Sequence, residues 1–234
     1  MKWIILFFSA FSIVSLQAQI SPGIYHVKDS VDGLIFTHEL KIDNTYLIHT
    51  IYTESPPGFV KTVGGFYNLE NDVLIVKLEF NSNYEEDTTT SVELPVAIVE
   101  EGLVLIGDNN LTFKKDPELK QPLDGKWLFA TRGPDEGQER RGESNSRKTM
   151  KVLSDGYFQW IAYDTETFKF SGTGGGTYTS KDGVYSENIQ FFSRDNARVG
   201  ALLNFTYEIK GNDWHHKGKN SKGGPMYEIW AIRK

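Results

Sequence analysis

Short runs of alternating apolar and polar residues fill most of this chain, and no stretch keeps a helical period over several turns. In VLIVKLEF (residues 73–80), every second residue from Leu74 to Phe80 is apolar, whereas Lys77 and Glu79 fall on the opposite face. Gly, Asn and Asp separate the runs. The pattern predicts an all-β protein in which the face of Leu74, Val76, Leu78 and Phe80 lines an interior.

The chain also repeats itself with an offset of 111 residues. Nine residues of the first copy are identical, without a gap, to the residue 111 positions later: Tyr46, Tyr52, Phe59, Thr62, Gly64, Gly65, Tyr67, Val73 and Phe80. Unrelated sequences share far fewer over such a span. The predicted copies are residues 20–116 and 121–234, joined by the charged, proline-containing stretch KKDPELKQPLDG.

Each copy contains six to eight short strand-like runs, which suit a small antiparallel sheet. Closing such a sheet into a barrel removes its exposed edges. The predicted fold is therefore two small antiparallel β-barrels in tandem.

Composition and the N-terminus narrow the classes of function. Residues 1–19, MKWIILFFSAFSIVSLQAQ, have the lysine, apolar run and small residue of a cleaved signal peptide, which predicts a secreted or periplasmic protein. No later apolar run is long enough for a membrane span. The absence of cysteine excludes disulfides and thiolate metal sites, and the net charge of -6 argues against a nucleic-acid partner.

Five segments of the second copy carry a family resemblance: DGKWLF (124–129), YFQWIAYD (157–164), GGGTYTSKDGVYSENI (174–189), DWHHKG (213–218) and EIWAIR (228–233). They resemble lipocalin-like proteins of the calycin superfamily, especially secreted domains of Bacteroidota that have no assigned function. The likeness covers residues 122–234, and the first copy shares it only through the repeat. It implies a small apolar ligand inside a barrel, Trp127 at the barrel floor, and Arg233 as the basic residue that covers Trp127.

Candidate ligand-binding residues follow from the repeat, because the inward positions of the first copy map onto polar and aromatic residues of the second. The predicted set is Phe158, Trp160, Tyr185, Glu187, Phe191, Trp214 and His216. A buried carboxylate needs a hydrogen-bond partner, a proton or a water-filled cavity, so Glu187 is the most informative member. The first barrel, with aliphatic inward positions, is expected to be filled.

The sequence contains no clear signature of metal binding, hydrolysis or nucleotide binding. His215 and His216 point to opposite faces of a strand and cannot share one metal ion. Neither a Gly-x-Ser-x-Gly nor a Walker motif is present, so no catalytic residue, metal or cofactor is predicted. The glycines of GTGGG (172–176) lead into a strand rather than a helix, and Gly175 and Gly176 are expected to mark a bend or bulge.

Three hypotheses remain open at this stage. The first is an exported protein that binds a small, largely apolar molecule in its second barrel, where Glu187→Ala should alter binding and leave the fold intact. The second is an adaptor or scaffold with two filled barrels that binds protein or glycan through its loops. The third is a barrel enzyme using Glu187 and His216 as acid and base. The charged loop of residues 133–148 is either a solvated surface or a lid.

Overall fold

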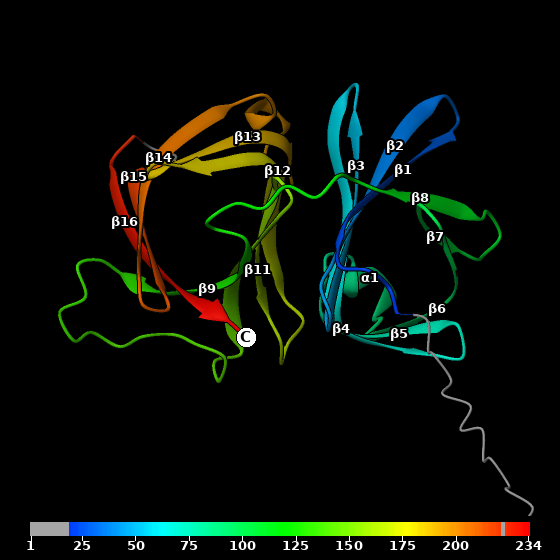
Figure 1. The fold of residues 1–234 in the computed structure, drawn as a ribbon, viewed down its shortest axis with the longest axis horizontal. Coiled ribbons are helices and arrows are strands. Elements are labelled where there is room, and N and C mark those ends of the chain that lie inside the picture. The colour runs from blue at the N-terminus through cyan, green and yellow to red at the C-terminus, as the bar shows by residue number, and fades with distance from the viewer. Residues whose placement is uncertain (1–18, 221–222) are drawn as a thin grey trace, which may run out of the picture.

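The computed structural model describes residues 19–220 and 223–234, and their sixteen strands form two closed antiparallel barrels of eight strands each (Figure 1). The predicted all-β class and the tandem arrangement of two barrels are confirmed. All of the predicted signal peptide except Gln19 lies outside the described residues.

The first barrel contains, in chain order, β1 (Gly23–Val31), β2 (Leu34–Ile42), β3 (Tyr46–Glu54), β4 (Pro57–Glu70), β5 (Val73–Asn81), β6 (Ser91–Val99), β7 (Gly102–Leu105) and β8 (Leu111–Lys115). Each strand pairs with the next, and β8 closes the ring on β1. A single turn of helix, α1 (Tyr84–Asp87), connects β5 to β6.

The second barrel contains β9 (Gly125–Arg132), β10 (Arg147–Ser154), β11 (Tyr157–Asp164), β12 (Phe170–Lys181), β13 (Val184–Phe192), β14 (Leu202–Lys210), β15 (Asp213–Lys219) and β16 (Pro225–Arg233). Here β16 closes on β9, and a 3-10 turn, η1 (Asn196–Arg198), follows β13. In the described part of the chain, no helix has the length and apolar character needed to cross a membrane.

Asp-Gly turns explain why several runs fold back as hairpins. At Asp32-Gly33, Asp155-Gly156 and Asp182-Gly183, both residues have positive φ, between 49° and 84°. A two-residue hairpin turn of this type matches the twist of the strands it joins, and Asp-Gly is among the pairs that adopt it most readily. Local sequence thus sets the register of the β1–β2, β10–β11 and β12–β13 hairpins.

The two barrels carry the same irregularities at positions 111 residues apart. The β3–β4 register shifts between Ile51 and Tyr52, and the β11–β12 register shifts at the equivalent Ala162 and Tyr163. A second shift lies between Gly64 and Gly65 in one barrel and between Gly175 and Gly176 in the other. The internal repeat is therefore structural as well as sequential.

The second glycine of each pair, Gly65 or Gly176, lies where the backbone of the neighbouring strand comes too close for a side chain. A Cβ atom on Gly65 would lie 1.9 Å from the carbonyl oxygen of Lys77, and one on Gly176 would lie 2.1 Å from that of Asn188. Gly176 also has a φ of 152°, a backbone conformation that other residues rarely adopt. Both glycines allow the sheet to bend where it closes.

The prediction that Phe80 and Phe191 face inward is wrong, because each lies beyond a β-bulge. Each bulge leaves one residue of the partner strand unpaired, so the alternation reverses before Phe80 and Phe191. Both rings point out of their own barrels: Phe80 contacts Tyr163 of the second barrel, and Phe191 lies 4.9 Å from Tyr52 of the first.

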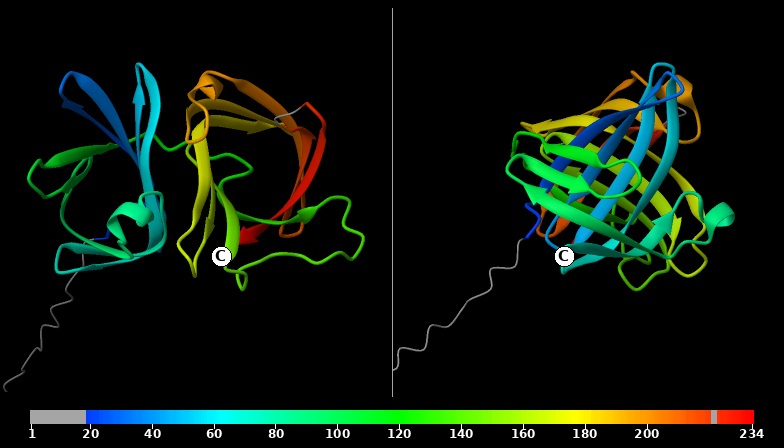
Figure 2. Two further views of the ribbon diagram at one scale, coloured as in Figure 1. Left: turned by 180° about the vertical axis from the view of Figure 1, so that it is seen from behind. Right: turned by 90° about the vertical axis from the view of Figure 1, so that its right-hand side faces the viewer.

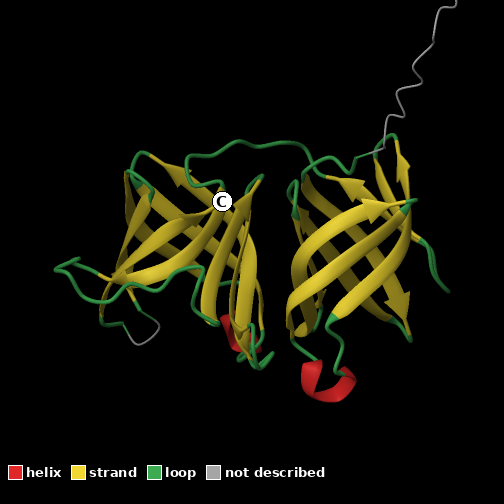
Figure 3. Cartoon of the chain, turned by 90° about the horizontal axis from the view of Figure 1, so that it is seen from below, coloured by secondary structure: helices red, strands yellow, loops and turns green. Residues whose placement is uncertain are grey.

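The barrels lie side by side, and strands of the two face each other along their length (Figures 2 and 3). One apolar cluster spans the contact, with residues from β3 and β5 on one side and from β9, β10 and β11 on the other: Tyr46, Ile48, Phe80, Leu128, Met150, Val152, Ile161 and Tyr163. Within it, the buried Gln159 amide accepts from Thr50 Oγ1 at 3.0 Å and donates to Thr62 Oγ1 at 3.2 Å. The interface is therefore both apolar and hydrogen-bonded.

A charged group on the first barrel also sits at this contact. His26 Nε2 lies 3.1 Å from Glu39 Oε2, and His26 Nδ1 lies 3.2 Å from Asp116 Oδ2 in the connecting segment. The His26 ring is 5.0 Å from that of Tyr157 in the second barrel. Glu39 is fully buried and also pairs with Lys41, so its carboxylate is held between two cationic groups.

This arrangement predicts a loss of stability at alkaline pH. Burial by itself lowers the pKa of His26, but hydrogen bonds to Asp116 and Glu39 and their charges outweigh it and raise the pKa to about 9. The unfolded chain has an ordinary histidine pKa of 6.5, so the contribution is complete below that pH and disappears as pH rises through 9. We expect the free energy of unfolding in urea to fall by about 3 kcal/mol over this range.

The control is the same urea series on His26→Gln, for which the decline should largely vanish. His215→Gln, at a more exposed histidine, should keep it. An equal decline in the wild type and in His26→Gln would show that another group titrates.

Candidate ligand-binding cavity

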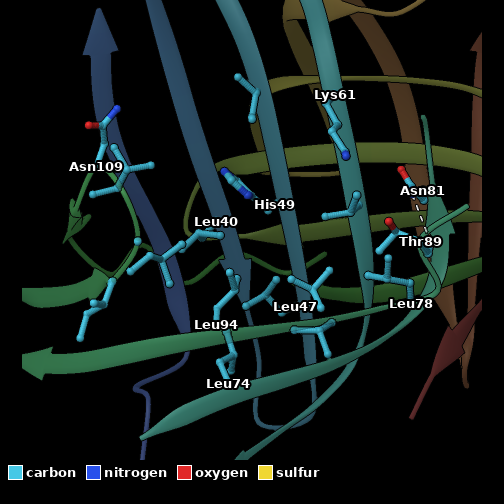
Figure 4. A pocket seen from close by; sticks show the side chains of 18 residues that line it. Leu40, Leu47, His49, Lys61, Leu74, Leu78, Asn81, Thr89, Leu94 and Asn109 are labelled. Atoms are coloured by element: carbon cyan, nitrogen blue, oxygen red, sulfur yellow. Dashed lines mark hydrogen bonds between the residues drawn. The ribbon is translucent and has the colours of Figure 1, made fainter. Parts of the chain in front are cut away.

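The first barrel encloses a cavity of about 360 Å³ (Figure 4). Its wall is mostly aliphatic, with side chains contributed by seven of the eight strands, among them Leu40, Leu47, Leu74, Val76, Leu78, Leu94 and Leu105. The expectation that aliphatic residues fill this barrel is wrong, because their combined volume leaves the centre open. The volume lies at the lower end of the range of about 300–1,000 Å³ typical of small-molecule sites.

A neutral imidazole provides one polar group on the cavity wall. His49 lies on β3, and its Nε2 is 3.1 Å from Nδ1 of His38 on β2. Burial, the largest cause, lowers the pKa of His49 to about 3, and burial also lowers the pKa of His38. Both rings are therefore uncharged at neutral pH, and one donates a hydrogen bond to the other.

Most of the other polar side chains in the lining gather beside the loop that contains α1, and Asn109 lies across the cavity from them. Lys61 Nζ lies 2.9 Å from Asp87 Oδ2, and Asn81 Nδ2 donates to Asp87 Oδ1 at 2.7 Å and to the Thr89 carbonyl at 3.2 Å. Figure 4 places Lys61, Asn81 and Thr89 on the same side of the cavity, away from Leu74 and Leu94. The cavity thus has a long apolar wall and one polar side that carries a half-exposed lysine.

Aromatic rings occupy the interior of the second barrel. Trp214 is fully buried and contacts Trp127, Tyr185 and Trp230, with ring centroids 5.8, 5.1 and 6.0 Å away. Phe158 is fully buried in the same cluster. Trp160 is partly buried, packs against this cluster and contacts the ring of Phe192. These contacts bring together most of the residues predicted to bind a ligand, but as a packed core.

An ion pair lies among these rings. Lys151 Nζ is 2.8 Å from Glu187 Oε1, which also accepts a hydrogen bond from Tyr185 Oη at 2.8 Å. The two charged side chains are only 7% and 5% exposed, and the ammonium lies 5.1 to 5.3 Å from the rings of Tyr185, Trp214 and Trp230. Glu187 therefore has a positively charged partner and a hydrogen-bond donor, which together offset the cost of burying its charge.

Among the described residues, Glu187 is bonded to Lys151 and Tyr185 and has no hydrogen bond or ion pair with His216, so the acid–base pair considered from the sequence is not formed. His216 Nδ1 lies 3.7 Å from Glu228 Oε2, which is longer than a hydrogen bond. Burial, followed by the charge of Lys151, lowers the pKa of His216 to about 4, so the ring is neutral. Within the described residues, both of its nitrogens and Nε1 of Trp214 have no hydrogen-bond partner.

The repeat explains why one barrel is hollow and the other filled. At equivalent positions, Leu47 and Leu74 of the first barrel become Phe158 and Tyr185 of the second. In the same way, His49 becomes Trp160 and Leu103 becomes Trp214. The larger rings fill the space that the smaller side chains leave open. Comparing side-chain volumes across the repeat would have located the cavity from sequence.

The two residues that the lipocalin resemblance singled out have different surroundings. Trp127 lies inside the second barrel, where its Nε1 donates to the Leu123 carbonyl at 2.9 Å. Arg233 points away from it: its guanidinium lies 2.7 and 2.8 Å from the two carboxylate oxygens of Glu79 on the first barrel. Arg233 thus joins the barrels.

Comparisons with protein-family models and with curated protein sequences find no match for this chain. The arguments about function therefore rest on the geometry of the two barrels.

Proposed function

We propose that this protein is exported and binds a small, largely apolar molecule in the cavity of its first barrel, as its resemblance to lipocalin-like proteins would imply. The observation that carries the proposal is the aliphatic cavity of about 360 Å³ in a closed barrel. A purely structural barrel gains stability by filling such a space, since cavities in a core are destabilising. The second copy is filled in this way.

The polar side of the cavity indicates what kind of molecule fits. A neutral imidazole at His49 offers one hydrogen bond, and Lys61 offers a positive charge that Asp87 partly offsets. A chain-like or ring-like apolar body with a single hydroxyl, carbonyl or carboxylate group would satisfy both regions. The filled interior of the second barrel favours a supporting role for that copy.

Calorimetric titration with 1-decanol and with decanoate tests the proposal. We expect saturable binding of at least one of them, and at least tenfold weaker binding in the double variant Leu47→Phe, Leu74→Phe, because these rings imitate Phe158 and Tyr185 of the second barrel. Lys61→Gln should weaken binding of decanoate more than of decanol.

Leu202→Phe is the matched control, since Leu202 is an exposed residue on the second barrel. Its binding should equal that of the wild type. If the folded double variant binds both probes as tightly as the wild type, the cavity of the first barrel is not the site.

A further inference from the structure

Three arginines of the second barrel converge on one of its ends without a carboxylate partner. Arg132 is the last residue of β9, Arg147 is the first residue of β10, and Arg141 belongs to the loop that connects them. Within residues 19–220 and 223–234, none of their guanidinium groups forms a salt bridge or a side-chain hydrogen bond. Because β9 and β10 are antiparallel neighbours, the end of one lies beside the start of the other.

Strand register places Arg132 and Arg147 on the interior face. Arg132 lies directly opposite Glu228, whose carboxylate is inside the barrel near His216. Arg147 precedes Lys151 by four residues on a strand whose pairing with β11 has no irregularity, so it shares the inward face of Lys151. Both side chains therefore extend over the end of the aromatic core.

The loop brings the third arginine to the same place. The Arg141 backbone N–H donates to the Ala130 carbonyl at 2.8 Å, in the gap that opens where β9 and β10 stop pairing. Its guanidinium stacks 4.5 Å from the centroid of Phe129, a ring that in turn contacts Trp230 inside the barrel. Burial and then the charges of Arg147 and Arg132 lower the pKa of Arg141, which agrees with three cations in close proximity.

Four acidic side chains at this end of the barrel have partners other than these arginines. Glu228 accepts from Trp230 Nε1 at 3.2 Å, and Asp164, directly opposite Arg147, accepts from Ser146 Oγ and from two backbone N–H groups of its own turn. In the loop, Asp135 pairs with Arg140 and Glu143 pairs with Arg233. The two cross-strand ion pairs that the register would allow are not formed.

The loop is also held in place before any ligand arrives. Arg140 binds both carboxylate oxygens of Asp213, at 2.7 and 3.0 Å, and Lys148 Nζ donates to the carbonyls of Glu143 and Asn145 at 2.6 Å. Such preorganisation reduces the entropy lost on binding.

We propose that Arg132, Arg141 and Arg147 form a binding site for a phosphomonoester at this end of the second barrel. The three guanidinium groups carry more charge than Glu228 and Asp164 beside them, so this end of the barrel favours an anion. Guanidinium groups bind phosphate through paired, charge-assisted hydrogen bonds. The site is independent of the cavity in the first barrel, so either can fail without the other.

Titration of the full chain with phenyl phosphate, at constant ionic strength, tests the site. We expect saturable binding to one site, and about tenfold or weaker affinity in each of Arg132→Gln and Arg147→Gln. Both residues are exposed and have no structural partner, so these variants should fold. Inorganic phosphate should bind if the phosphate group alone is recognised, and benzoate, a monoanion, should bind more weakly than phenyl phosphate.

Lys114→Gln is the charge-matched control, because Lys114 is a highly exposed lysine of the first barrel. It should leave the affinity unchanged. No saturable binding of either phosphate compound by the wild type would overturn the proposal. So would a loss of affinity in Lys114→Gln equal to that in Arg147→Gln, since only general charge attraction would then be at work.

Discussion

Glu187→Ala is expected to destabilise the folded protein by about 3 kcal/mol or more, because it leaves the ammonium of Lys151 buried without its counterion. Tyr185 also loses the acceptor for its hydroxyl group. The surrounding rings offer partial compensation through cation–π contacts, which places the expected value at the lower end of the range for broken buried pairs. Urea unfolding measures the effect. The sequence alone predicted that this substitution would leave the fold intact, and the ion pair is the reason to expect otherwise.

The double variant Lys151→Leu, Glu187→Val separates loss of the pair from loss of packing. The first copy has Leu40 and Val76 at the equivalent positions, so this combination is already compatible with the barrel. Apolar replacement of both partners of a buried ion pair is often neutral or stabilising. We therefore expect the double variant to be more stable than Glu187→Ala and within about 1.5 kcal/mol of the wild type.

Glu208→Ala provides the surface control, because the pair of Glu208 with Lys210 is more than half exposed. Its effect should stay below about 0.5 kcal/mol. If Glu187→Ala were as stable as the wild type, or if the double variant were less stable than Glu187→Ala, the buried pair would not have the role assigned to it.

Sequence alternation located the interior faces wherever strand pairing is uninterrupted. Tyr185, Glu187 and Trp214 all lie inside the second barrel because β13, β14 and β15 pair without a bulge at these residues. The same rule failed at Phe191, which lies beyond the bulge at Gly175 and Gly176. The glycine pair indicated that an irregularity was present. Whether the later side chains of a strand point inward or outward depends on which strand carries the extra residue, and the glycines do not specify that.

The location of the cavity was missed for a different reason. Polar and aromatic inward residues suggested a ligand pocket in the second barrel. The aromatic rings are large enough to fill the interior, so the same residues form a packed core. Lys151, the partner of Glu187, lies three strands away in the closed ring and on a separate hairpin, so no local pattern joins the two. The repeat offered the missing signal: it aligns Lys151 with Leu40, a residue that lines the cavity of the first barrel.

Arg233→Ala is expected to destabilise the protein by about 3–5 kcal/mol, because the arginine neutralises a carboxylate of the other barrel in a buried interface. Without it, Glu79 is only 13% exposed and retains just the hydroxyl groups of Tyr46 and Tyr163, at 2.7 and 3.0 Å. The two hydroxyl groups cannot balance its charge. Since the lost contact joins the barrels, the variant should also show less cooperative unfolding, with the two barrels melting over separate temperature ranges.

Arg140→Ala is the matched control, since Arg140 also binds both oxygens of a carboxylate, that of Asp213, but on the surface of the second barrel. It should cost less than about 1 kcal/mol. The double variant Arg233→Met, Glu79→Leu should recover much of the stability lost in Arg233→Ala, because no charge is left unpaired. Calorimetric unfolding of the four proteins decides the matter: equal losses for Arg233→Ala and Arg140→Ala, with a single transition in each, would mean that apolar packing alone holds the barrels together.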